Sequence, residues 1–362
     1  MADAKVADTP EKRRGVGIAW GGFNVTEGGG DSAEVALELM PGNKIRKYDT
    51  WHAMGQGATT GSLVVTLEAL KEMHLTPEDI QLIQNDTKTC PDTGMAGASR
   101  SLYMDGNATI IAANKLLAAM RKEDGTLRTY DEMKAEGIET KYLGRYETNT
   151  TPGLCRLDPN TGIGDPTPAF TYCLNLAEVE VDTKTGKTTV LKFTCVDFVG
   201  RIGNIDAVNG QAYSGIMHGI GFALKEDYAD VKKHANMFGA GTSYIKDVPD
   251  DINLIHIDGA ISDGPFGSSG ASEAFQASGH CAVLNGIYNA CGVRIHEIPA
   301  LPEKVKAGLD AIAKGEKPYE PKKYFLGSDM YEELENIKEN PVQVGTQSFY
   351  VSLDDPTAER PF

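Results

Sequence analysis

The sequence predicts a mixed α/β protein of the α+β class. Two stretches, 16–24 and 32–40, carry the every-second-residue apolar pattern of half-buried strands. Apolar residues at helical spacing follow in several longer segments, and three of these come after glycine-rich loops at 55–57, 94–100 and 264–270. With 362 residues, 41% of them hydrophobic, the chain can build one large or two medium domains.

The first part of the chain is expected to alternate between strands and helices. Residues 1–13 are interpreted as an N-terminal tail and residues 14–168 as the first half of a ligand-binding region. Strands are expected at 16–24, 32–40, 44–54 and 80–84, and helices after residue 58 and from the 93–100 loop to residue 120. Thr76–Pro77–Glu78–Asp79 has the signature of a helix start. The charged segment 121–150 is expected to be a surface excursion.

The second half, 169–315, is expected to begin with a hairpin. Strands at 169–181 and 188–196 flank a turn that contains Gly186. Segment 204–224 is predicted to be a buried helix whose four glycines must be compensated by close packing against backbone or ligand. A helix at 271–291, a closing strand at 293–298 and a last helix at 302–313 should follow. Residues 316–362 are interpreted as a C-terminal tail.

Composition limits the possible partners. The chain has 35 Lys and Arg against 51 Asp and Glu, a net charge of −16, which argues against nucleic acid and anionic membranes. No apolar run approaches the roughly 18 residues of a membrane span, and the first residues lack the apolar core of a signal peptide, so a cytoplasmic location is expected. The six cysteines form no C-x-x-C pair and the seven histidines no H-x-x-x-H pair. Side chains of this chain are therefore not expected to ligate a metal or an iron–sulfur cluster.

The stretch DGPFGSSGASEAFQ, residues 263–276, contains the main candidate residues for ligand binding and catalysis. Its glycines permit a close approach of backbone to ligand, and amides at a helix start favour an anion. Glu273 could act there as a general base, or it could only complement the helix N-terminus. The three glycine loops, with His52, Gln56, Arg100 and Gln211 near them, suggest a long, multiply charged ligand, although ordinary turns before helices are the alternative. No nucleotide-binding motif of the G-x-x-x-x-G-K-[ST] kind is present.

Four spaced motifs together resemble one family: WHAMGQGATTG, TCPDTGMAGASR, GRIGNIDAVNGQAYSGIMHGIGFALKED and GPFGSSGASE. They are similar to the molybdenum-binding C-terminal portion of the xanthine oxidase family. Within it they resemble the bacterial aldehyde oxidoreductases that use molybdopterin cytosine dinucleotide. The similarity extends from about residue 15 to about residue 339. It implies a molybdenum enzyme that oxidises aldehydes to carboxylic acids with water as the oxygen source.

The resemblance also implies roles for particular residues. Glu273 matches the catalytic base beside the molybdenum, which the family holds by the dithiolene of the pterin. Gln211 matches a glutamine that hydrogen-bonds near the pterin. The remaining cofactor-binding residues implied are His52, Met54, Gly55, Gln56, Gly57, Met95, Ala96, Gly97, Ala98, Ser99, Arg100, Gly267, Ser268, Ser269 and Gly270.

Family members carry two [2Fe–2S] domains and a first molybdenum-binding domain ahead of this region. The resemblance therefore implies a partner subunit with the other half of the molybdenum domain, and [2Fe–2S] clusters on a partner and not on this chain. Two alternatives stay open. One is a subunit of a purine or nicotinate (N-heterocycle) hydroxylase, and the other is a non-catalytic scaffold that forms half of the cofactor cleft.

Overall fold

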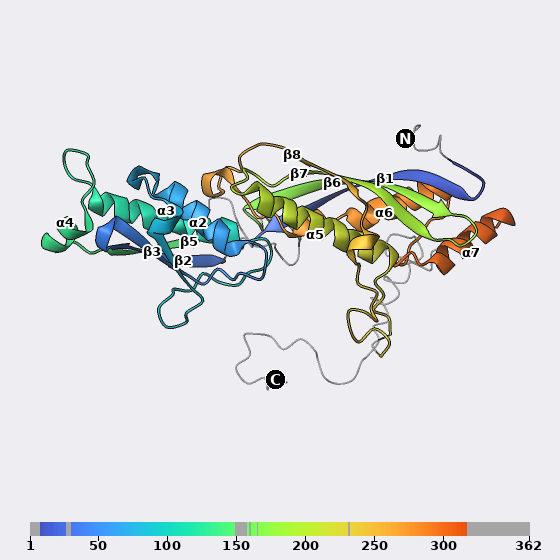
Figure 1. Cartoon of the computed structure of the whole chain (residues 1–362), viewed down its shortest axis with the longest axis horizontal. Coiled ribbons are helices and arrows are strands. Elements are labelled where there is room, and N and C mark those ends of the chain that lie inside the picture. Colours follow the sequence, from blue (N-terminus) through green and yellow to red (C-terminus); the bar gives the residue numbers. More distant parts are fainter. Residues whose placement is uncertain are drawn as a thin grey trace. The chain divides into compact units, whose positions relative to one another are not determined.

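A computed structural model describes residues 8–26, 30–148, 158, 161–164, 166–230 and 232–316 (Figure 1). These residues form two four-stranded sheets with helices packed on them, which confirms the expected mixed α+β class. None of the described helices is both long and apolar enough to cross a membrane. The predicted C-terminal tail lies outside the described residues except for Glu316.

The first sheet has the strand order β1-β6-β7-β8, formed by β1 (Lys12–Val25), β6 (Ala169–Asp182), β7 (Thr188–Phe198) and β8 (Asp251–His256). The β1–β6 and β6–β7 pairs are antiparallel, and β8 joins β7 in parallel. Helices α5 (Ile205–Leu224) and α6 (Gly279–Cys291) cover one face and share a buried core with the sheet. Alternating small residues of β1 let α6 lie against it, since a Cβ at Gly17 would meet the Ala282 carbonyl oxygen at 1.9 Å.

The second sheet has the order β4-β3-β2-β5, formed by β2 (Ser32–Met40), β3 (Lys44–Asp49), β4 (Ile80–Gln84) and β5 (Lys141–Glu147). Helices α2 (Ala58–Ala69) and α3 (Ser101–Met120) pack on it. Alternate residues of β2, Leu37 and Leu39, point into a core shared with Leu116 of α3. Two further helices are α4 (Tyr130–Ala135) and α7 (Pro302–Ala313).

Short 3-10 turns link the main elements: η1 (Pro41–Asn43), η2 (Lys71–Met73), η3 (Pro77–Asp79), η5 (Ile245–Asp247), η6 (Pro265–Gly267) and η7 (Glu273–Gln276). The helix-start signature at Thr76 therefore produces a single 3-10 turn. Its capping box is satisfied by Asp79, but β4 begins immediately afterwards.

Close packing accounts for three of the four glycines of α5, Gly215, Gly219 and Gly221, as predicted. A Cβ at Gly215 would meet the Cβ of Phe275 at 2.5 Å, and one at Gly219 would meet the Cα of Gly279 at 3.0 Å. The helix therefore approaches η7 and α6 at backbone distance. Gly210 has open space around it, so packing does not explain that position.

Several sequence predictions were wrong in detail. Segment 121–150 is not only a surface excursion, because β5 pairs with β2 and a capping box at Thr129 starts α4. The closing strand at 293–298 does not form; α6 ends at Cys291, its C-cap Gly292 has φ of 78°, and residues 293–298 pair with no strand among the described residues. The third strand stops at Asp49, and α6 begins at Gly279 instead of residue 271. Strand β8 was not expected.

The predicted division at residue 168 stays a prediction, but β1 crosses it by pairing with β6. The N-terminal tail ends earlier than residue 13, because Lys12 already belongs to β1. Residues 1–7 of that tail lie outside the described residues.

Candidate functional site

A cleft of ≈ 920 Å³ lies where three helices begin. Its lining includes Gly57 and Ala58 at the start of α2, Ser101 at the start of α3 and Ala207 in the first turn of α5. Amides in the first turn of a helix lack partners within that helix, and the helix dipole is positive there. The cleft therefore presents three positive helix ends to one ligand, which favours an anion.

Most of the predicted site residues lie together in this lining. They are Met54, Gln56, Gly57, Ala96, Gly97, Ser99, Gln211, Gly267, Ser268, Ser269, Gly270 and Glu273. The structure does not place the other five in the lining: His52, Gly55, Met95, Ala98 and Arg100. Residues from segments more than a hundred positions apart in sequence thus meet around one space.

Glu273 stands in η7, and its partner comes from a distant loop. The Ser99 hydroxyl donates a hydrogen bond to the Glu273 carboxylate, and the Glu273 backbone N–H donates to the same hydroxyl oxygen at 3.3 Å. Glu273 is partly exposed and faces the cleft, so a proton can reach its carboxylate. The turn was predicted as the first turn of a long helix, and only η7 forms there.

The loop that carries Ser99 has a strained backbone. Ala98 and Ser99 both have φ of 49°, a left-handed conformation that non-glycine residues adopt at a cost of about 1–3 kcal/mol. The N–H of Thr26 holds the Ala98 carbonyl at 3.0 Å. On the other side lies Gly270, where a Cβ would stand 1.8 Å from the Ser99 carbonyl oxygen. The two glycine-containing loops therefore touch through their backbones.

Arg100 holds this loop from within and does not face the cleft. Its guanidinium donates to both carboxylate oxygens of Asp31, at 2.7 and 2.8 Å, and to the carbonyls of Ser32, Thr93 and Met95. The side chain is 3% exposed. The structure thus corrects the expectation that Arg100 meets an anionic ligand: its donors are used to order residues 93–100.

The loop of residues 263–270 is fixed by neighbours on both sides. Pro265 packs on Gly106 of α3, where a Cβ would approach the proline ring at 2.6 Å. The carbonyl of Gly267 accepts hydrogen bonds from the N–H groups of Arg201 and Ile261. Gly267 has φ of 84°, and a Cβ there would meet Ala260 at 2.8 Å. Protein neighbours therefore already require glycine at 267.

Two sets of partly buried polar contacts hold helix α5 beside the cleft. The Asn204 side chain caps the helix by accepting from the Ala207 N–H. Asn209 and Asp197 each bond one ring nitrogen of His256, at 2.8 and 2.7 Å, and burial raises the pKa of Asp197. Two residues beyond Asn209, the Gln211 side chain lines the cleft with its amide unpaired among the described residues.

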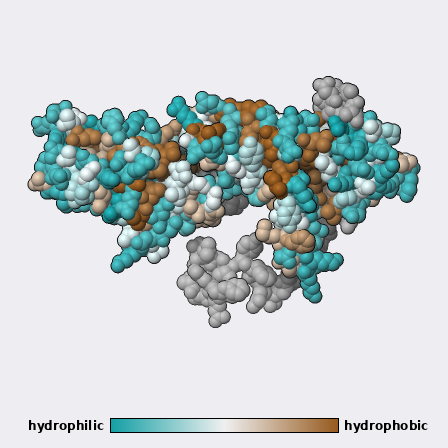
Figure 2. All heavy atoms as spheres, viewed as in Figure 1, coloured by the Kyte–Doolittle hydropathy of each residue, from teal (hydrophilic) through white to brown (hydrophobic). Residues whose placement is uncertain are grey.

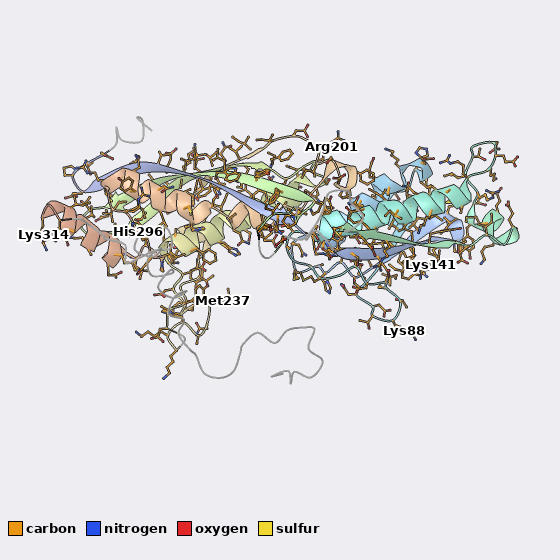
Figure 3. The ribbon with its side chains drawn as sticks, turned by 180° about the vertical axis from the view of Figure 1, so that it is seen from behind. Lys88, Lys141, Arg201, Met237, His296 and Lys314 are labelled. Carbon is orange, nitrogen blue, oxygen red and sulfur yellow. The ribbon has the colours of Figure 1, made fainter. Side chains whose placement is uncertain are left out.

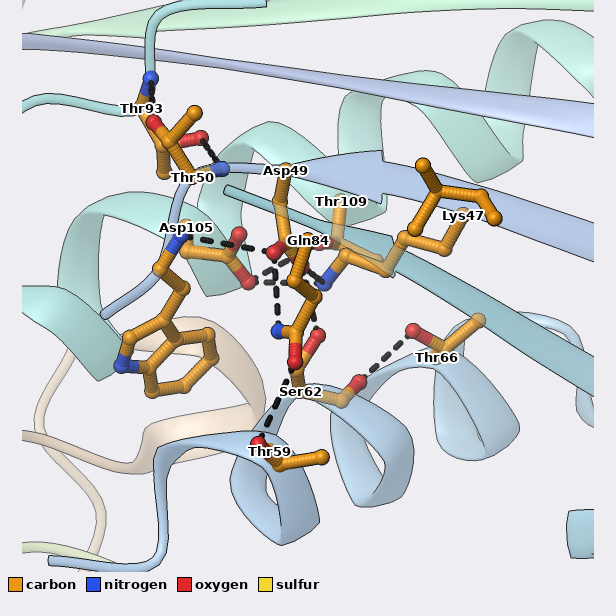
Figure 4. A network of polar contacts seen from close by, with 12 residues as sticks. Lys47, Asp49, Thr50, Thr59, Ser62, Thr66, Gln84, Thr93, Asp105 and Thr109 are labelled. Atoms are coloured by element: carbon orange, nitrogen blue, oxygen red, sulfur yellow. Dashed lines mark hydrogen bonds and ion pairs between the residues drawn. The ribbon is translucent and has the colours of Figure 1, made fainter. Parts of the chain in front are cut away.

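A second buried network lies beside the first strand-to-helix loop (Figure 4). Lys47 donates to Asp105 at 2.8 Å and lies 3.4 Å from Asp49, and all three side chains are buried. Asp49 also accepts from Ser62 of α2 and, at 3.3 Å, from the backbone N–H of Trp51. Trp51 lines the cleft, so this network joins β3, α2 and α3 to the cleft wall.

Arg201 is a lining residue that the sequence reasoning missed. It follows β7, its side chain is exposed, and no described residue forms an ion pair with it (Figure 3). Lys71 also lines the cleft, but its ammonium is paired with Glu68 at 3.0 Å. The available signal was the G-R-I-G sequence, a cation between glycines just before a helix.

The lining fits a large, anionic, hydrogen-bonding ligand. Within the described part of the chain, the buried hydroxyl of Ser269 and the side-chain amide of Gln211 have no hydrogen-bond partner, and Arg201 supplies positive charge. Among the described residues, no group of three or more His, Cys, Asp or Glu side chains is placed to hold a metal ion.

Comparison with known proteins defines the class. Residues 2–249 match the molybdopterin cofactor-binding domain family, and the chain belongs to that family, as the molybdenum-binding domain of the xanthine oxidase type. It is 40% identical over 311 residues to the aldehyde oxidoreductase of Megalodesulfovibrio gigas, covering 86% of this chain and 34% of that protein.

A crystal structure of the aldehyde oxidoreductase from Desulfovibrio desulfuricans ATCC 27774 superposes with a TM-score of 0.81 at 43% identity, over 84% of this chain and 33% of that one. A probable hypoxanthine oxidase of Escherichia coli K12, XdhD, is 28% identical over 72% of this chain and 29% of its own length. The chain thus spans about a third of the length of these relatives.

Proposed function

We propose that this chain is the cofactor-binding part of a molybdenum hydroxylase that oxidises aldehydes to carboxylic acids, with water as the oxygen source. The observation that carries the proposal is the hydrogen bond from Ser99 to Glu273 at the wall of a cleft that receives three helix N-termini. A carboxylate held in place beside an anion-binding cleft is suited to general-base catalysis. The similarity to aldehyde oxidoreductases supports this reaction class.

The proposed cofactor is molybdopterin cytosine dinucleotide. Its phosphates fit the helix ends and Arg201, and its pterin fits the hydrogen-bonding groups of Gln211 and Ser269. The bound molybdenum would supply the two-electron oxidation. Glu273 would remove a proton from the attacking water, and Ser99 would keep the carboxylate pointed at the reacting oxygen.

The proposed enzyme works with further polypeptide. Because the chain spans about a third of its relatives, a partner subunit carrying the other half of the molybdenum domain and [2Fe–2S] clusters is proposed. The cytoplasmic location expected from the sequence stays a prediction.

Similarity to a probable hypoxanthine oxidase favours a second candidate, hydroxylation of N-heterocycles. The two candidates share the cofactor and the base, so only the substrate separates them. The higher sequence identity to an aldehyde oxidoreductase than to the probable hypoxanthine oxidase favours an aldehyde as the substrate.

The test uses the native complex, purified through a tag on this chain. Molybdenum and cytosine nucleotide released on denaturation are measured per chain, and turnover is compared for aldehydes, hypoxanthine and nicotinate. The proposal expects about one molybdenum per chain and turnover of aldehydes. Turnover only of heterocycles would establish the second candidate. A complex that contains molybdenum and retains turnover when Glu273 is replaced by Gln would make this chain a scaffold.

A further inference from the structure

No helix or strand among the described residues covers one face of the β1-β6-β7-β8 sheet, although Gly259, in the segment after β8, lies against the ring of Phe198. Helices α5 and α6 bury the residues of the opposite face, such as Val179 and Phe193. Alternate residues of the four strands point the other way and remain half-buried or exposed. We call the apolar part of this surface the open face: Ile18, Trp20, Phe170, Tyr172, Leu174, Val196, Phe198 and Ile255.

Aromatic rings dominate the open face and order one another. Trp20 and Tyr172 stack with ring centroids 5.7 Å apart, and Tyr172 stacks on Phe170 at 6.4 Å. A Cβ at Gly22 would touch the Tyr172 ring at 3.3 Å, so glycine leaves room for the ring above β1. Trp20 nevertheless remains 66% exposed and Phe170 45% exposed. Stacked aromatics with large exposed fractions are typical of contact surfaces.

The polarity of this surface changes along the strands. One row across the sheet is apolar in all four strands, since Trp20 is opposite Leu174, Leu174 opposite Val196 and Val196 opposite Ile255. Four residues further towards the start of β7, a second row contains Glu178, Lys192 and Asp251. The apolar part therefore lies at one end of the sheet.

That apolar end leads directly into the cleft. Phe198 closes β7, and the next residues, Val199, Arg201 and Ile202, line the cleft. Gly200 forms a β-bridge with Ser268 of the cleft loop. In Figure 2, apolar residues reach the surface around β7 and β8. The open face and the cleft wall are thus one continuous surface.

We propose that the open face binds the partner subunit that completes the cofactor cleft, through an apolar and aromatic surface on that partner. This inference rests on the proposed function. Its support is the continuity with the cleft, because a polypeptide closing the cleft beside Arg201 reaches Phe198 and Tyr172 next. The chain also spans only 34% of the aldehyde oxidoreductase of Megalodesulfovibrio gigas, so further polypeptide is proposed to supply the remainder. The charged row marks where this contact ends.

The experiment places a photo-crosslinking amino acid, p-benzoylphenylalanine, in the native complex at Trp20 and, as a control, at Lys184. Lys184 lies in the turn after β6, and its side chain is 68% exposed. Crosslinks are mapped by mass spectrometry, with molybdenum and iron measured in the same preparation. The proposal expects Trp20 to crosslink to the iron-containing subunit and Lys184 not to do so.

A second measurement compares Trp20→Ser with Trp20→Phe for dissociation of the native complex on dilution. Loss of a buried aromatic anchor is expected to weaken binding about tenfold or more in Trp20→Ser, with most affinity retained in Trp20→Phe. Crosslinks from Trp20 to a second copy of this chain or to its own residues overturn the proposal, as does equal binding by both variants. Absence of a second polypeptide from preparations that contain molybdenum also overturns it. Preparations with the expected crosslink but without molybdenum would instead contradict the proposed function.

Discussion

The Ser99 hydroxyl donates a hydrogen bond to the Glu273 carboxylate, joining two residues 174 positions apart in sequence. Ser99 reaches Glu273 from a backbone in the left-handed region, with φ of 49°. Strain of this kind is kept where the surrounding structure requires it. The pair therefore links the two cleft loops and gives the carboxylate a fixed orientation.

Replacing Glu273 by Gln should lower turnover per bound molybdenum by roughly 10²-fold or more, because the amide cannot accept the proton that a general base removes. The amide can still accept a hydrogen bond from Ser99, so cofactor content should stay the same. Glu68 also lines the cleft and provides the control as Glu68→Gln. Equal turnover in the two variants would rule out Glu273 as the base.

Two substitutions of Ser99 distinguish the effect of its hydroxyl hydrogen bond from the effect of its backbone conformation. Both Ser99→Ala and Ser99→Gly remove the hydroxyl and should lower turnover to a similar extent. Glycine also relieves the left-handed strain, so Ser99→Gly should be about 1 kcal/mol more stable than Ser99→Ala in chemical unfolding. If turnover fell in Ser99→Ala but not in the more stable Ser99→Gly, Ser99 would only shape the loop.

Gly270→Ala should displace the Ser99 loop even though the change adds one methyl group. The new Cβ would stand 1.8 Å from the Ser99 carbonyl oxygen, so one of the two loops must move. Thermal unfolding should shift to lower temperature, and molybdenum content should fall. Gly97→Ala is the matched control in the same cleft, since its Cβ would meet only the Met95 side chain, at 3.7 Å. Similar unfolding temperatures for both variants would contradict the loop contact.

Asp105 should make stability fall as pH rises from about 4 to 6. Burial raises its pKa from 3.8 to about 6, against the opposing effect of Lys47. The native state therefore binds more protons than the unfolded state between these values, and the stabilisation present below the unfolded pKa is lost as pH passes the native pKa. The change for this one group is on the order of 3 kcal/mol.

Asp105→Asn should flatten this part of the stability profile, measured by urea unfolding at several pH values. Burial also raises the pKa of Asp197, so stability should still fall somewhat with rising pH in this variant. Asp79 provides a control whose pH dependence of stability has the opposite sign. Hydrogen bonds from Thr76 lower the pKa of Asp79, so the stabilisation from this carboxylate is lost as pH falls. An unchanged slope in Asp105→Asn would show that this carboxyl does not titrate as its burial implies.

The sequence located most of the elements because their apolar patterns are local. The strand at 32–40 and the helix at 302–313 have the predicted bounds. Strand β5 was missed because its alternation is masked by charged residues such as Lys141 and Arg145, and only pairing with β2 reveals it. The segment expected to be a strand at 293–298 has suitable residues, but the described part of the chain offers no neighbouring strand to pair with it.

The sequence by itself determined the mixed α+β class, the family and the loops that surround the cleft. The reason is that glycine-rich loops, helix starts and family motifs are short patterns of neighbouring residues. Tertiary structure decided what each loop residue faces. Arg100 has the charge for an anionic ligand, yet Asp31 and three carbonyls take up its donors, while Arg201 faces the cleft unpaired among the described residues. Gly267 and Gly270 are already required by their protein neighbours Ala260 and Ser99. Such contacts join segments far apart along the chain, so no local pattern of residues can encode them.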